Sequence, residues 1–63
     1  MWVVEDHTNT RNGNRVGWLA LTYDGEEIAT FYPFARNRSN AEAHWIITQA
    51  QKIAECMNNA GLL

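Results

Sequence analysis

The chain has 63 residues, 46% of them apolar, which suffices for one small domain over residues 1–63. Five Lys and Arg against seven Asp and Glu give a net charge of -2, which excludes a global basic field for nucleic acid. One cysteine excludes an internal disulfide, and no apolar run approaches the roughly 20 residues of a membrane span. The opening MWVVED lacks the pattern of a signal peptide, so we expect a bacterial cytoplasmic location without membrane contact.

Three segments predict β-strands. Residues 2–7, WVVEDH, are β-branched and aromatic, but their acidic end suits an edge strand. Residues 8–15 are polar and predict a loop, in which the Asn12-Gly13 step supplies the positive φ angles of a hairpin turn. Residues 16–23 form the strongest strand pattern, and a DGE turn separates them from residues 27–32. Two short turns predict an antiparallel meander.

A helix is predicted after the third strand. Pro33 closes that strand because it lacks an amide donor. Ser39 and Glu42 match a capping box at the helix start, and Gly61 suits a left-handed C-cap at its end. The sequence therefore predicts an α+β fold in which a three-stranded antiparallel β-meander packs against one C-terminal α-helix (βββα).

The predicted helix has one apolar stripe, about 120° wide, for packing on the sheet. Trp45 lies about 140° from the centre of this stripe, on the polar side of the helix. The members of the stripe are Ala43, Ile46, Ile47, Ala50, Ile53, Ala54 and Met57.

The second strand has apolar residues at consecutive positions, so they divide between the two faces of the sheet. We expect Leu19 and Leu21 to face the helix, which leaves Trp18 on the uncovered face, joined by Trp2 or an aromatic residue of the third strand. Whether Phe31 or Tyr32 joins Trp18 depends on the length of the second turn, because a one-residue slip exchanges the faces. An uncovered aromatic face indicates an interface.

Trp45 admits two interpretations. Gln49, Lys52 and Cys56 follow it at helical spacing, and together they form a ridge that can dock on a partner. In the alternative, the indole bends over the helix and covers a sheet edge or the loop around Phe34. We expect the docking role, because tryptophan is enriched among interface hot spots.

Four of the five positive charges fall in the two loops that a meander brings to one end of the sheet, where the helix also begins. This basic pole should attract anions, either nucleic-acid phosphates or an acidic protein patch. In the alternative, Glu5, Asp6 and Glu42 neutralise it in surface ion pairs. The charges are Arg11, Arg15, Arg36 and Arg38.

Residues with catalytic or metal-binding potential do not form a known pattern. His7 and His44 have no partner at metal-ligand spacing, and Ser39 is explained as the helix cap. Cys56 has one basic neighbour, Lys52, a turn earlier, and no glycine-rich phosphate loop exists. We therefore expect no catalytic residues, no metal, no cofactor and no enzymatic activity.

The second half of the chain, from Glu27 onward, resembles small uncharacterised phage and prophage proteins. The resemblance lies in a strand ending in IA plus an aromatic residue, followed by an AEA helix with Ile-Ala pairs. It implies an accessory protein that acts on a bacterial host, but no single activity.

The βββα order is also similar to the opening half of the ribonuclease H fold. Asp6 would match the carboxylate of its first strand, and Glu42 the carboxylate of its helix. The chain stops before the elements that carry the remaining metal ligands, and two carboxylates do not hold a two-metal site. This resemblance implies a shared half-fold rather than a nuclease.

We therefore expect a non-enzymatic binding module, a phage or mobile-element accessory protein that docks on a host protein and inhibits or modulates it. The second expectation is a nucleic-acid binder that uses the basic pole, with Trp18 as a stacking platform. The third is a homodimer that buries the open sheet face. The expected partner-binding residues are Trp18, Trp45, Gln49, Lys52, Arg36, Arg38, Arg11 and Arg15.

Overall fold

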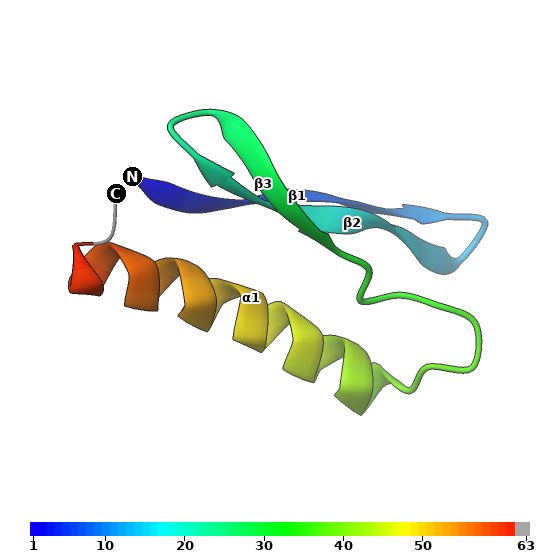
Figure 1. Ribbon diagram of the computed structural model, residues 1–63. Coiled ribbons are helices and arrows are strands. Elements are labelled where there is room, and N and C mark those ends of the chain that lie inside the picture. Colours follow the sequence, from blue (N-terminus) through cyan, green and yellow to red (C-terminus); the bar gives the residue numbers. More distant parts are fainter. Residues whose placement is uncertain (62–63) are drawn as a thin grey trace.

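A computed structural model describes residues 1–61 and has the expected βββα order (Figure 1). The strands are β1 (Trp2–Arg11), β2 (Asn14–Tyr23) and β3 (Glu26–Phe31), and the helix is α1 (Asn40–Ala60). The strands form one antiparallel sheet in the order β1-β2-β3. The helix lies across one face of this sheet and leaves the other face uncovered (Figure 1).

The first hairpin is longer than the sequence analysis predicted. β1 continues to Arg11 and β2 begins at Asn14, so the predicted loop over residues 8–15 is wrong. Only Asn12 and Gly13 form the turn, with φ angles of 52° and 78°. Two consecutive positive φ angles give a turn whose twist matches that of paired strands, so the polar residues on both sides stay in the ladder.

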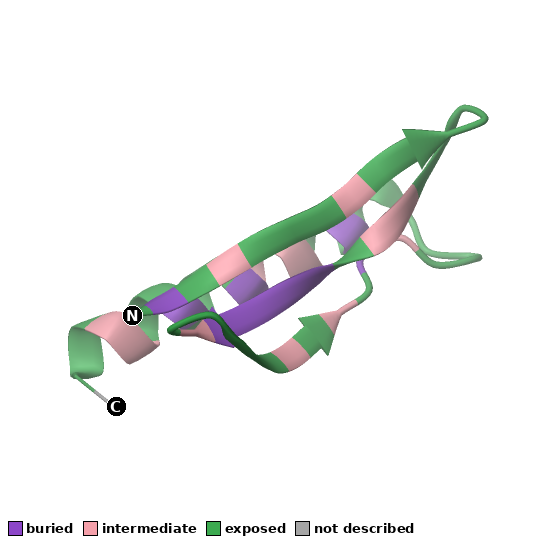
Figure 2. Ribbon diagram, turned by 90° about the horizontal axis from the view of Figure 1, so that it is seen from above, coloured by how far each residue is buried: buried purple, intermediate pink, exposed green. Residues whose placement is uncertain are grey.

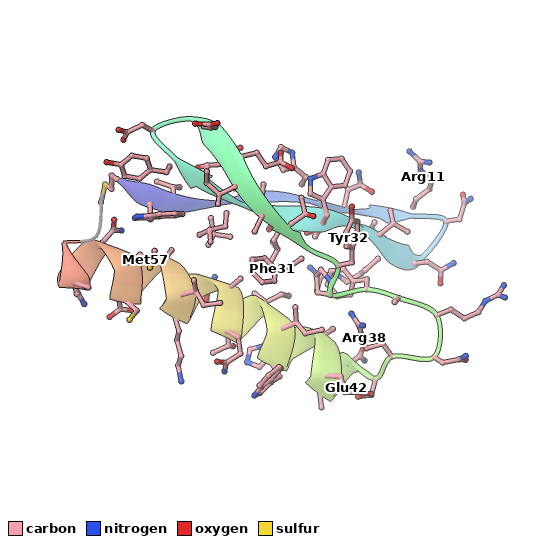
Figure 3. All side chains as sticks on the ribbon, in the orientation of Figure 1. Arg11, Phe31, Tyr32, Arg38, Glu42 and Met57 are labelled. Carbon is pink, nitrogen blue, oxygen red and sulfur yellow. The ribbon has the colours of Figure 1, made fainter. Side chains whose placement is uncertain are left out.

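The second hairpin decides which aromatic residue of β3 faces the helix. Its turn also has two residues, Asp24 and Gly25, and the register shifts by one residue between Leu21 and Thr22. Phe31 pairs with Leu19 and therefore points toward the helix, whereas Tyr32 points to the opposite side (Figure 3). Tyr32 is thus the aromatic residue that shares the open face with Trp18.

The core is small and lies at the end of the sheet near the N-terminus. Trp2, Leu21 and Ala54 form its buried cluster, with Phe31 and Met57 among the side chains packed against it (Figure 2 shows the buried positions). The expectation that Trp2 could lie on the open face is wrong, because Trp2 pairs with Tyr23 on the helix side and is only 6% exposed.

The ends of α1 form as the sequence predicts. The Ser39 hydroxyl accepts a hydrogen bond from the Glu42 amide at 3.1 Å, and a Glu42 carboxylate oxygen accepts one from the Ser39 amide at 3.0 Å. Gly61 ends the helix in the left-handed conformation, with φ of 68°. These caps satisfy backbone groups that a helix cannot pair internally.

Alanines form the contact line between helix and sheet. Ala43, Ala50 and Ala54 are the buried residues of α1, and their small side chains let the helix approach the sheet closely. The helix packs mainly against β1. Ile53 lies beside this line and is 40% exposed, so its predicted place in the core is wrong.

Asn58 fastens the last turns of α1 to β1. Its side-chain amide donates to the Trp2 carbonyl and accepts from the Trp2 amide, both at 2.8 Å. A second side chain acts at the same strand: Asp6 accepts from the amide and the hydroxyl of Thr8, at 2.8 and 2.5 Å. Side chains therefore occupy backbone groups of β1 that β2 does not use.

We expect Asn58→Ala to lower the free energy of unfolding by about 1–3 kcal/mol, because two part-buried backbone groups lose their partner. Asn59→Ala is the matched control, since Asn59 is the exposed neighbour and should change stability by less than about 0.5 kcal/mol. Urea denaturation followed by circular dichroism measures both. Equal effects of the two substitutions would contradict the role given to Asn58.

Candidate functional site at the arginine cleft and the Trp45 surface

Three arginines line a cleft between the tip of the first hairpin and the segment that joins β3 to α1. The cleft has a volume of about 670 Å³. Arg15 comes from β2, whereas Arg36 and Arg38 come from the connection before the helix. Asn14 and Asn40 also line it. We call this the arginine cleft.

Contacts that involve no carboxylate hold two of these arginines. The Arg15 guanidinium carbon lies 4.3 Å from the centre of the Phe34 ring, a cation–π contact. Arg38 donates a hydrogen bond from Nη1 to the carbonyl oxygen of Tyr32. Both guanidinium groups are therefore held without a close ion pair among the described residues, and their charges act only at longer range, that of Arg15 on Asp6 and that of Arg38 on Glu42.

In the part of the chain that the structure describes, the arginines form no close ion pair with the acidic side chains, although the charge of Arg15 acts on Asp6 and that of Arg38 acts on Glu42. Within residues 1–61, no arginine lies within 4.0 Å of a carboxylate oxygen. The proposed acidic partners have other contacts: Glu5 lies 3.5 Å from the His7 ring, Asp6 accepts from Thr8, and Glu42 accepts from Ser39.

Arg11 belongs to a different surface from the other three arginines. It lies on the side of the sheet away from the helix, whereas Arg38 lies beside the helix start (Figure 3). Arg11 and Arg15 come from paired strands of one hairpin, but only Arg15 lines the arginine cleft. The predicted basic pole is therefore divided between the two faces of the sheet.

Trp45 is solvent-exposed on α1, next to the arginine cleft. Its residue is 62% exposed, so the alternative in which the ring covers the loop around Phe34 is wrong. Trp45, Arg38, Glu42 and Ile46 line a shallow depression of about 230 Å³. Arg38 lines both this depression and the arginine cleft, so the two form one continuous surface.

The rest of the predicted ridge follows Trp45 along the helix. Lys52 and Cys56 are exposed and Gln49 is half-buried. Lys52 and Cys56 also line a second surface hollow near the end of the helix. The ridge is thus accessible over most of its length.

The open sheet face carries a second group of aromatic side chains. Trp18 is 40% exposed and stacks on His7 of β1, with ring centres 5.1 Å apart and planes 18° apart. Tyr32, Val3 and Ile28 are also exposed, by 60%, 46% and 52%. This face lies on the side of the sheet away from α1, the helix that carries Trp45 (Figure 1).

Two carboxyl groups near these surfaces have lowered pKa values. Hydrogen bonds from the hydroxyl and then the amide of Thr8 lower the pKa of Asp6. For Glu42, hydrogen bonds from the amide and then the hydroxyl of Ser39 lower the pKa, with a smaller effect of the Arg38 charge. Both groups are thus stabilised as carboxylates by folding.

We expect acid to destabilise the fold through these two groups. The unfolded chain takes up protons near the ordinary pKa values, 3.8 for Asp6 and 4.5 for Glu42, before the folded chain does. The contribution of the two carboxylates to the free energy of unfolding is fully present above about pH 4.5. It is lost as the pH falls through their lowered pKa values in the folded state. Denaturant titrations between pH 7 and 2.5 measure this loss. Asp6→Asn/Glu42→Gln should have a flatter pH profile, and an unchanged slope would contradict the assignment.

Phe34 is the contributor to the cleft that sequence analysis missed. The sequence suggested Phe34 only as a residue that the Trp45 ring could cover, whereas its own ring lies against the Arg15 guanidinium. The signal that could have indicated this contact is the position of an aromatic residue between Pro33 and the arginines Arg36 and Arg38. Within residues 1–61, no three His, Cys, Asp or Glu side chains converge as metal ligands, and no helix is long and apolar enough to cross a bilayer.

Comparisons with models of protein families, with curated proteins and with solved structures found no match to this chain.

Proposed function

We propose that this protein is a non-enzymatic binding module that docks on a partner protein through the surface around Trp45. The observation that carries the proposal is the 62% exposure of Trp45 on the helix. A tryptophan in this position contributes little burial to its own fold and exposes a large apolar ring to water. Burial against a partner would remove that cost.

The neighbours of Trp45 support a protein interface. Tryptophan and arginine are two of the residue types most enriched among interface hot spots, and here Trp45 and Arg38 line the same depression. Arg36 and Arg15 extend the surface with positive charge. The partner that fits best presents an apolar pocket for the indole, bordered by acidic side chains.

We infer that the partner is a protein of a bacterial host and that docking inhibits or modulates it. This part of the proposal rests on the resemblance of the helix half to phage and prophage proteins. It predicts that the partner is found in bacterial lysate rather than encoded beside this chain.

An affinity capture tests the proposal. Tagged protein is incubated with nuclease-treated bacterial lysate, and bound proteins are identified by mass spectrometry for the parent chain and for Trp45→Ala. We expect one protein to be captured by the parent and lost from the variant, because truncating an interface tryptophan typically costs at least about 2 kcal/mol. Trp18→Ala is the matched control, since it removes an exposed indole from the other side of the molecule.

Salt dependence separates this function from nucleic-acid binding. Binding to a phosphate backbone weakens steeply with salt because counterions are released, whereas an interface anchored by an indole depends on salt much less. Retention of the partner at raised salt is therefore expected. If Trp45→Ala captures the same proteins as the parent, the proposed docking surface is wrong.

A further inference from the structure

Docking through Trp45 gives the arginines a role as positive charge beside the interface, but it does not account for the cavity that three of them line. Arg15, Arg36 and Arg38 line one cavity, and no carboxylate oxygen within residues 1–61 lies within 4.0 Å of them. Like charges gathered in one cavity repel one another, and the carboxylates that act on Arg15 and Arg38, those of Asp6 and Glu42, do so from beyond ion-pair distance. A bound anion would remove that repulsion and use the donors that the guanidinium groups carry.

Two of the guanidinium groups are held in place with most of their donors free. A guanidinium has five N–H donors. Arg38 uses a donor on Nη1 for the Tyr32 carbonyl. Arg15 is held by the face of the Phe34 ring, 4.3 Å from its guanidinium carbon, in a contact that needs no hydrogen bond. The remaining donors are available for bidentate recognition of an anion.

Asn14 and Asn40 line the same cleft. Each amide offers donors as well as an acceptor, so it can bind either an oxygen of an anion or a hydroxyl attached to it. The cleft is therefore lined by arginines, which bind the anion, and by asparagines, which can hydrogen-bond to the group attached to it.

We propose that the arginine cleft binds a phosphomonoester group. Such a group carries about -1.5 to -2 charges near pH 7 and several strong acceptor oxygens, which suits a cavity lined by three arginines better than a single carboxylate does. It is also compact enough for a cleft of about 670 Å³.

A long nucleic-acid strand fits this molecule less well. The chain has a net charge of -2, so it does not attract a polyanion over long distances. The turn at the other end of the sheet carries Asp24, Glu26 and Glu27, which would repel a strand that ran along the molecule. A compact phosphomonoester is sensitive mainly to the local charge of the cleft.

Titration of the ¹⁵N-labelled protein, followed by backbone amide NMR shifts, tests the proposal. The probes are O-phosphoserine, a nucleoside 5′-monophosphate and inorganic phosphate, with serine as the uncharged-side-chain control. We expect the three phosphates to shift amides in the hairpin tip and in the segment before the helix, and serine to shift none. The ratio of the first two affinities identifies the source of the phosphomonoester.

Variants then assign the binding to the cleft. Arg15→Ala and Arg38→Ala should each weaken O-phosphoserine binding by about 10- to 100-fold, as expected for hydrogen bonds to a charged group. Arg11→Ala is the matched control, because it removes the same charge from the same hairpin but lies outside the cleft. It should change the affinity less than about twofold.

Two further variants distinguish a loss of binding from a loss of folding. Arg36→Ala changes an exposed residue and should still weaken binding severalfold. Arg15→Lys/Arg38→Lys keeps the net charge but removes the bidentate geometry, so about a tenfold loss is expected.

Three results would overturn the proposal. The first is no phosphate-induced shift around the cleft, and the second is an equal loss in Arg11→Ala and Arg15→Ala, which would indicate a diffuse field. The third is much tighter binding, per phosphate, of a single-stranded oligonucleotide without terminal phosphates. The docking proposal is tested separately by Trp45→Ala, which leaves the three arginines of the cleft in place and should leave phosphate binding unchanged.

Discussion

Gly17→Ala is expected to destabilise the protein by about 3–5 kcal/mol, a large part of the stability of a domain of this size. Gly17 has a φ of 107°, a conformation that residues with a side chain rarely adopt. A Cβ atom there would also lie 2.2 Å from the carbonyl oxygen of His7 and 2.8 Å from the Cα of Thr8. Both are backbone atoms of the paired strand, so relief requires the hairpin to deform.

Gly13→Ala separates the two contributions. Gly13 also has a positive φ, 78°, but a Cβ atom there meets nothing within 4 Å. We expect it to cost about 1–2 kcal/mol, the penalty of the conformation alone. Thermal and urea unfolding of both variants, followed by circular dichroism, measure the difference. Equal losses would show that the close approach of β1 and β2 at Gly17 carries no energetic weight.

Trp2→Ala is expected to cost about 3–5 kcal/mol and Trp45→Ala less than about 1 kcal/mol. Trp2 is 6% exposed, lies in the buried cluster and has its ring centre 5.2 Å from that of Tyr23. Trp45 is 62% exposed. The total stability expected for 63 residues is roughly 3–9 kcal/mol, so the first substitution removes much of it.

The pair of substitutions also tests the functional assignment of Trp45. Each variant loses one indole, so the change in composition is matched and only the location differs. Urea titrations of both give the two free energies of unfolding. If the Trp45 variant loses as much stability as the Trp2 variant, its ring packs within the molecule, and the docking proposal loses its main support.

Local signals predicted the order of elements and the ends of the helix. Ser39, Glu42 and Gly61 act through hydrogen bonds and φ angles within a few residues, so their effect is visible in sequence. The same holds for Asn12 and Gly13 in the first turn. The three-stranded meander followed from two short turns, and it is confirmed.

Properties that depend on pairing between strands were harder to predict. Polar residues beyond His7 indicated a loop, yet the ladder with β2 holds them in a strand. The side on which Trp2 lies depends on its pairing with Tyr23, which was unknown until the turn length was fixed. Ile53 was placed in the core by helical periodicity, but the helix packs mainly against β1 and leaves it exposed.

The candidate site was predicted only in part, because some of its contacts depend on strand register and on an irregular segment. Proximity of the two arginine-containing loops followed from topology, but the division between Arg11 and Arg15 required the register of the hairpin. Phe34 and Arg38 lie in the irregular segment between β3 and α1, where no periodic sequence pattern exists. Their contacts could therefore not be predicted from the sequence. The exposure of Trp45 was visible because it depends only on helical spacing.

The side-chain contacts along β1 limit how molecules of this protein can polymerise. An exposed strand edge is a template on which further strands add, and an open-ended fibre needs two such edges in each molecule. Here Asn58 and Asp6 occupy backbone groups of β1 at Trp2 and Thr8, so an added strand would have to displace both. Addition of a strand at the β1 edge would therefore cost these hydrogen bonds, and growth confined to the edge at the short strand β3 would end at a pair of molecules.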